Sequence, residues 1–243
     1  MSKKHLKIAE KFLQKTFPKA NSAFVSGSII RGEGKEHSDL DIVLLFTKLP
    51  NAFRESFIFE SIPVEVLAHD RETIHWFISN EQKNGKASLA HMITTGVVVP
   101  KATVLSKQVL ACANEYLKLG PQKPSKKVLD ELRYRICDIL DDLRDERPKQ
   151  EVMACATQLY PLLAELIFRN ASQWVAGGKW IPRSLQQLDS RMAANFDHAF
   201  ADAFNGKTKK LILFSEKILT EAGGPLWDGW HSDAPNKWKK KFK

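Results

Sequence analysis

The pattern of apolar and polar residues changes character about one hundred residues into the chain. The first part mixes helical and strand periodicities, and it begins with an amphipathic stretch over 3–16 that predicts a helix. Short apolar, β-rich runs then predict four strands, at 23–25, 42–46, 57–59 and 64–67. The last two are expected to form a hairpin with its turn at 61–63, which contains Pro63. The pattern turns helical after residue 70, and a final short strand is predicted at 97–99.

Beyond residue 100 nearly all apolar positions recur at helical spacing. Four helices are predicted, at 125–146, 150–175, 183–204 and 207–222. The segment 120–125 places two prolines and a glycine between periodic stretches, which is typical of a linker. We therefore predict an α+β protein in which a small mixed β-sheet domain over 1–110 precedes an all-α helical bundle over 120–243.

Composition limits the class of protein but does not identify a binding partner. The chain has 243 residues, 43% of them apolar, which suffices for a buried core. Neither a continuous apolar run of about 20 residues nor the apolar core of a signal peptide is visible, so we expect a cytoplasmic protein without a membrane partner. The net charge of +9 suits polyanions, but lysines crowded into the last seven residues supply part of it. Three widely spaced cysteines support neither a zinc knuckle nor a disulfide framework.

Candidate chemistry is concentrated between residues 24 and 43. Gly27 follows a predicted strand and lets the backbone turn and approach a ligand without a Cβ in the way. Ser28 then opens a short helical turn, where free N–H groups and the hydroxyl can hold a phosphate. Asp39 and Asp41 begin the next strand two residues apart, so their carboxylates share one face.

A third carboxylate, Glu65, lies between two valines on the predicted hairpin, where sheet twist can bring it beside the aspartates. Carboxylates held side by side repel each other, and Mg²⁺, which prefers hard oxygen ligands, removes that penalty. Three convergent carboxylates can hold two Mg²⁺, one polarising an attacking hydroxyl and one neutralising a triphosphate. An Asp-x-Asp alone is often a solvated turn, so the metal-site hypothesis depends on the whole combination.

These motifs resemble the DNA polymerase β-like nucleotidyltransferase superfamily. The Gly-Ser-x-x-Arg-Gly opening at 27–32 looks most like its bacterial minimal and antibiotic-type branches, and the following helical part is similar in layout to kanamycin nucleotidyltransferase-like enzymes. The resemblance implies a donor nucleoside triphosphate, expected to be ATP, and two Mg²⁺, with Mn²⁺ as a substitute. The implied metal ligands are Asp39, Asp41 and Glu65. The implied triphosphate-binding residues at the motif are Gly27, Ser28 and Ser38.

Basic residues near the motif and in the helical part are further nucleotide-binding candidates. Arg31 either contacts a phosphate or forms a salt bridge with Glu33. Lys179 and Arg183 flank a short apolar stretch at the start of the third predicted helix, from which they could clamp a triphosphate. The alternative for both is ordinary surface charge.

The helix predicted at 125–146 has an apolar arc and an acidic opposite side. That acidic side is either a solvated face, partly balanced by arginines, or the acceptor side of the active site. In the second interpretation, supported by the resemblance to kanamycin nucleotidyltransferase-like enzymes, a carboxylate acts as general base on the acceptor hydroxyl or binds a cationic acceptor. Asp142 is the first candidate and Asp138 the second.

The sequence thus predicts an enzyme that moves a nucleoside monophosphate, with AMP favoured, from a triphosphate to a hydroxyl of a small molecule or protein. RNA 3′-end nucleotide addition is the enzymatic alternative. The positive charge permits RNA as a partner, but no recognisable RNA-binding motif favours it. A nucleotide-binding or regulatory protein of the toxin–antitoxin type is a third hypothesis, against which the complete set of three carboxylates argues.

Overall fold

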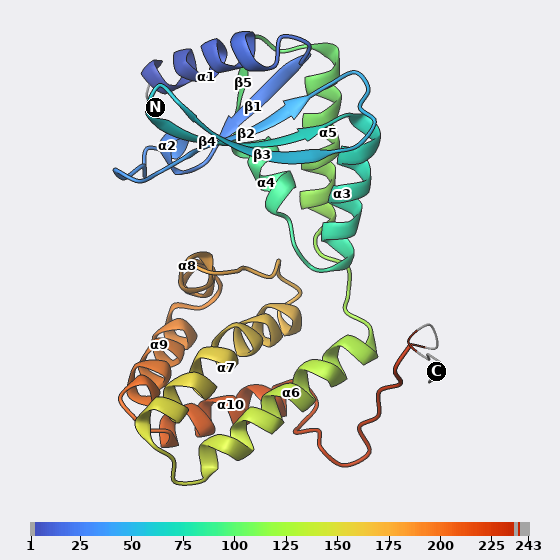
Figure 1. Ribbon diagram of the computed structural model, residues 1–243. Coiled ribbons are helices and arrows are strands. Elements are labelled where there is room, and N and C mark those ends of the chain that lie inside the picture. The colour runs from blue at the N-terminus through green and yellow to red at the C-terminus, as the bar shows by residue number, and fades with distance from the viewer. Residues whose placement is uncertain (1–2, 236–237, 239–243) are drawn as a thin grey trace, which may run out of the picture. The chain divides into compact units, whose positions relative to one another are not determined.

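The computed structural model describes residues 3–235 and 238, and two compact units make up the chain, Met1–Gln122 and Lys123–Lys243 (Figure 1). The lysines of the C-terminal tail, 237–243, lie outside the described residues. A mixed sheet in the first unit and helices in the second confirm the predicted α+β class. Each unit is described by itself.

The N-terminal unit is built on a sheet whose described strands follow the order β3-β4-β2-β1-β5. The strands are β1 (Ser22–Ser26), β2 (Leu40–Leu45), β3 (Phe53–Phe59), β4 (Ile62–His69) and β5 (Val97–Val99). The central pair β2 and β4 is parallel, and the other neighbouring pairs are antiparallel. The parallel pairing brings the starts of β2 and β4 to the same end of the sheet, which decides where their carboxylates lie.

Helices cover both faces of this sheet (Figure 1). They are α1 (Lys3–Thr16), the single turn α2 (Ser28–Arg31), α3 (Arg71–Lys83), α4 (Ser88–Thr95) and α5 (Val104–Leu119). Side chains alternate along a strand, so Ile42 packs with α1 and α2 on one face while Val43 packs with α3, α4 and α5 on the other. Asp41 therefore starts the row that leads into the α3–α5 face. The unit extends past residue 110 because Val109 and Ala113 of α5 belong to that second core.

The β3–β4 hairpin differs from the prediction in its length and its turn. Strand β3 begins at Phe53, four residues earlier than the apolar pattern indicates, and β4 already includes Ile62. The connection consists of Glu60 and Ser61, with φ values of 48° and 64°. Two consecutive positive φ values are the geometry of the tight hairpin turns that match strand twist, so the turn precedes the proline instead of containing it.

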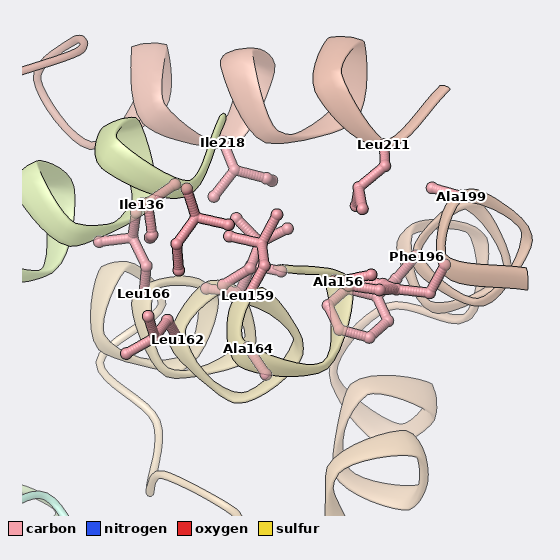
Figure 2. Close-up of a cluster of buried hydrophobic side chains, with 14 of the residues drawn as sticks. Ile136, Ala156, Leu159, Leu162, Ala164, Leu166, Phe196, Ala199, Leu211 and Ile218 are labelled. Carbon is pink, nitrogen blue, oxygen red and sulfur yellow. The ribbon is translucent and has the colours of Figure 1, made fainter. Parts of the chain in front are cut away.

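The second unit is a set of helices around one apolar core: α6 (Lys126–Arg144), α7 (Lys149–Asn170), α8 (Trp180–Leu188), α9 (Ser190–Phe204) and α10 (Lys209–Glu221). Figure 2 shows Ile136, Leu159, Phe196 and Ile218 from four of these helices meeting in that core. The prediction of a single helix over 183–204 is wrong, because the structure has two helices there, α8 and α9. Asp189 separates α8 from α9, and its carboxylate accepts a hydrogen bond of 2.9 Å from the Met192 amide, capping α9.

Helix α7 is apolar enough to need an explanation. By length and composition alone this 22-residue helix, among the residues described, could cross a membrane. Half of its most apolar stretch is buried inside the helical unit, including Leu159 and Leu163. Packing in a protein core therefore accounts for its composition.

Buried His69 at the end of β4 makes the stability of the N-terminal unit pH-dependent. Burial lowers the pKa of His69 to about 4, although neighbouring Asp70 opposes that shift. In the unfolded chain His69 takes up a proton near pH 6.5, whereas in the folded protein it does so only near pH 4. The free energy of folding that depends on neutral His69 is therefore fully present above pH 6.5 and is lost as pH falls towards 4.

We expect this histidine to reduce the free energy of unfolding by about 2 kcal/mol between pH 7 and pH 5. Urea unfolding of the wild type and His69→Leu at both pH values measures the effect. Equal losses of stability in the two proteins on acidification would contradict it.

Candidate active site

The turn between β1 and α2 holds the backbone against a carboxylate. Gly27 has φ 90° and ψ −177°, in the region that L side chains rarely adopt. A Cβ at this position would lie 2.3 Å from Oδ2 of Asp41, closer than real Cβ contacts. The adjacent Ser26 is the strand partner of Asp41. Glycine is thus required at position 27 both for its backbone conformation and for the space it leaves beside Asp41.

The loop that follows α2 folds back onto Ser28. The Ser28 hydroxyl donates a hydrogen bond of 3.0 Å to Oγ of Ser38, and the Lys35 amide donates one of 2.8 Å to the same oxygen. The two predicted triphosphate-binding serines are therefore brought together. Arg31 Nε lies 3.6 Å from Oε2 of Glu33, so the alternative salt bridge for Arg31 is present.

Two of the three predicted metal ligands lie directly opposite each other. Asp41 and Glu65 are register partners across the parallel β2–β4 pair, where neighbouring strands are about 4.8 Å apart. Both side chains are half-buried. Asp39 is also half-buried but precedes β2 by one residue, because the strand begins at Leu40 and not at Asp39 as predicted.

Arg54, which the sequence pattern did not single out, is bound to Glu65 of this pair. Its Nη2 lies 2.5 Å from Oε1 of Glu65. The hydrogen bond and charge of Glu65, followed by the charge of Asp41, raise the pKa of Arg54. Register explains the contact: Ser56 faces Glu65 and Arg54 faces Leu67, so Arg54 is the diagonal neighbour of Glu65 on the same face.

The residues present fit a divalent cation in their chemistry. Carboxylate oxygens are the donors that Mg²⁺ prefers, and the space a Cβ would fill at Gly27 adjoins Oδ2 of Asp41. In the part of the chain that the structure describes, however, no three Asp, Glu, His or Cys side chains are gathered closely enough to hold a metal. The Glu65 carboxylate is bound by Arg54 instead.

The acidic side of α6 is partly charge-balanced. Asp142, the first candidate for the general base, forms an ion pair of 2.6 Å with Arg147, whereas Asp138 is exposed. A cavity of about 360 Å³ lies beside this helix. Its lining includes Asp141, Arg144 and Glu216, but not Asp142. Two of the arginines expected to balance this face, Arg144 and Arg147, contact its carboxylates Asp141 and Asp142.

The basic candidates of the helical unit lie at the start of α8. Lys179 is the exposed residue just before the helix. The guanidinium carbon of Arg183 lies 5.0 Å from the centre of the Trp180 ring, at cation–π distance. Both residues belong to one turn of the helical unit, as their sequence spacing predicts.

Comparison with known proteins gives a family match for the part of the chain that contains Gly27, Asp41 and Glu65. No curated protein matches the chain. A solved nucleotidyltransferase-like protein from Exiguobacterium sibiricum 255-15 has a TM-score of 0.46 and 7% sequence identity, over 90% of this chain and 77% of that one. Residues 6–93, which include most of α1, the strands β1 to β4 and most of α4, match the family model of the nucleotidyltransferase domain.

Proposed function

We propose that the N-terminal unit transfers a nucleoside monophosphate, with AMP favoured, from a metal-bound triphosphate to a hydroxyl of a small molecule or protein. The observation that carries the proposal is the register pairing of Asp41 with Glu65, beside a turn that only glycine can make at position 27. This pairing lies within the segment that matches the nucleotidyltransferase domain.

Three carboxylates would hold the metal: Asp39, Asp41 and Glu65. Bound Mg²⁺ or Mn²⁺ supplies neutralisation of the triphosphate charge and polarisation of the acceptor hydroxyl. The backbone of Gly27 and the hydroxyls of Ser28 and Ser38 would orient the phosphates, supported by the hydrogen bond between the two serines. Arg31, Lys179 and Arg183 are the basic residues proposed to neutralise the remaining phosphate charge.

For the acceptor we propose the two-domain layout of kanamycin nucleotidyltransferase-like enzymes, with the helical unit on the acceptor side. Asp142 is the proposed general base, which takes the proton of the acceptor hydroxyl. The acceptor oxygen then bonds to the α-phosphorus as the bond from that phosphorus to the β-phosphate oxygen breaks and pyrophosphate leaves. The ion pair of Asp142 with Arg147 fixes the orientation of the carboxylate. Asp138, exposed one turn earlier on the same helix, is the second choice.

Incubation with each α-labelled nucleoside triphosphate and Mg²⁺ or Mn²⁺ tests the proposal. We expect label, most strongly from ATP, in a small-molecule or protein fraction. Label only in RNA would replace the proposed acceptor by an RNA end. Asp39→Asn combined with Asp41→Asn is the control, and equal labelling by this variant would show that the metal site is wrongly assigned. A separate thermal-shift measurement should show stabilisation by ATP with Mg²⁺ through mass action.

A further inference from the structure

We propose that Arg54 is an internal counter-cation of the Asp41–Glu65 pair, which a divalent metal ion must displace from Glu65 in order to bind. Arg54 would then set the metal affinity of the site and hold the Glu65 carboxylate until the metal binds. The inference rests on the proposed function, because it assumes that these carboxylates are metal ligands.

The geometry places a positive charge where the metal would need an oxygen. Arg54 reaches Glu65 from the neighbouring strand at 2.5 Å, and Asp41 is the register partner of Glu65 on the other side. Arg54 thus contacts Glu65 directly, whereas Asp41, on the strand beyond, acts on Arg54 only through its charge. The missing three-ligand cluster within the described residues agrees with a Glu65 side chain held by Arg54.

The charges explain why an arginine is useful there. Two carboxylates on adjacent strands, partly shielded from water, repel each other and would weaken the β2–β4 pairing. A guanidinium relieves that repulsion in the absence of metal. A divalent ion relieves it more strongly, but the metal and Arg54 repel each other and compete for the same oxygen of Glu65.

The position of Arg54 makes its displacement easy. Strand β3 is the edge strand of the sheet, and the Arg54 side chain is 67% exposed, whereas that of Glu65 is 23% exposed. The arginine can therefore swing into solvent by rotating its own side-chain bonds, with no change in strand pairing. Exposed ion pairs of this kind are weak and readily exchanged. Without metal, Arg54 would stay bound to Glu65, and a divalent ion that binds Glu65 would release Arg54 into solvent.

Manganese binding measures this competition directly. Free Mn²⁺ is followed by electron paramagnetic resonance during titration of the full chain without nucleotide, in the wild type and in Arg54→Gln. We expect the variant to bind Mn²⁺ about three- to tenfold more tightly, because both the competitor and the like charge are removed. Arg54→Lys, which keeps the charge but loses the planar fork, should fall between the two.

Arg71→Gln is the matched control. It removes the same charge from an exposed arginine of the same unit, just beyond the opposite end of β4, and should bind Mn²⁺ like the wild type. Melting temperatures without and with Mn²⁺ provide a second readout. The metal should raise the melting temperature of Arg54→Gln by more than that of the wild type, a difference that does not depend on catalysis.

The outcomes separate the two proposals. Equal or weaker Mn²⁺ binding by Arg54→Gln, with binding by the wild type intact, overturns the role of Arg54 and leaves the proposed function standing. Binding that is absent in both proteins, or is unchanged by Asp41→Asn, overturns the metal site itself and this inference with it. Tighter binding in Arg71→Gln as well would reduce the effect to net charge.

Discussion

Replacing Gly27 by alanine is expected to lower the rate of nucleotide transfer by at least about a hundredfold, because misplacing a reacting group by about 1 Å has an effect of that size. The added methyl group would lie 2.3 Å from Oδ2 of Asp41, so either that carboxylate or the turn has to move. Holding alanine at φ 90° and ψ −177°, a region occupied almost only by glycine, adds strain of about 1–3 kcal/mol. The ratio kcat/KM for ATP and the melting temperature measure the two effects.

Gly32 provides the matched control at the other end of the same helical turn. It also has a positive φ, 81°, but a Cβ there meets nothing within 4 Å. Gly32→Ala should therefore show a comparable loss of stability, about 1 kcal/mol, and keep its activity within about threefold of the wild type. If Gly27→Ala stays as active as Gly32→Ala, the close approach to Asp41 has no role in the reaction.

The local part of the candidate site follows from the sequence, since it depends on neighbours along the chain. The turn at Gly27 and the opening of α2 at Ser28 are short-range features of a strand followed by a small residue. Alternation along β2 similarly predicts the face on which Asp41 lies. The pairing with Glu65 was expected only as an approach within a twisted sheet, and the observed register makes it a direct opposition.

Arg54 could not be predicted from the same pattern. The first four residues of β3, 53–56, are exposed at the edge of the sheet, so they carry little of the apolar signal that marks a buried strand. The sequence therefore indicates the strand only from Phe57 onward. The contact between Arg54 and Glu65 needs both the longer strand and the hairpin register, and the register depends on the turn at 60–61.

In the helical unit the spacing of apolar residues predicts the buried face of each helix better than it predicts where the helix begins and ends. Apolar spacing continues from Ile181 and Leu185 to Ala193 and Phe196, which hides the break between α8 and α9. That break is produced by one capping side chain, Asp189. A cap is a local hydrogen bond and leaves no trace in the hydrophobic pattern, so a single long helix was predicted.

Replacing Asp41 by asparagine is expected to reduce nucleotide transfer by about a thousandfold or more while the protein remains folded. Asparagine has nearly the same shape, so the close packing against Gly27 is kept. It lacks the negative charge and one of the oxygens that attract a divalent ion, and metal-dependent stabilisation of the transition state amounts to several kcal/mol. Single-turnover rates with ATP, and Mn²⁺ affinity measured in parallel, test the prediction.

Glu55→Gln is the control that separates a metal ligand from a loss of negative charge. Glu55 lies on β3 between Arg54 and Ser56, so its side chain points to the opposite face of the sheet, and it is exposed. Its replacement changes the net charge as Asp41→Asn does and should leave both the rate and Mn²⁺ affinity unchanged. A partial recovery of Asp41→Asn at high Mn²⁺ would indicate weakened metal binding. Wild-type rates in Asp41→Asn would mean that the pairing of Asp41 with Glu65 serves only the structure of the sheet and has no role in the reaction.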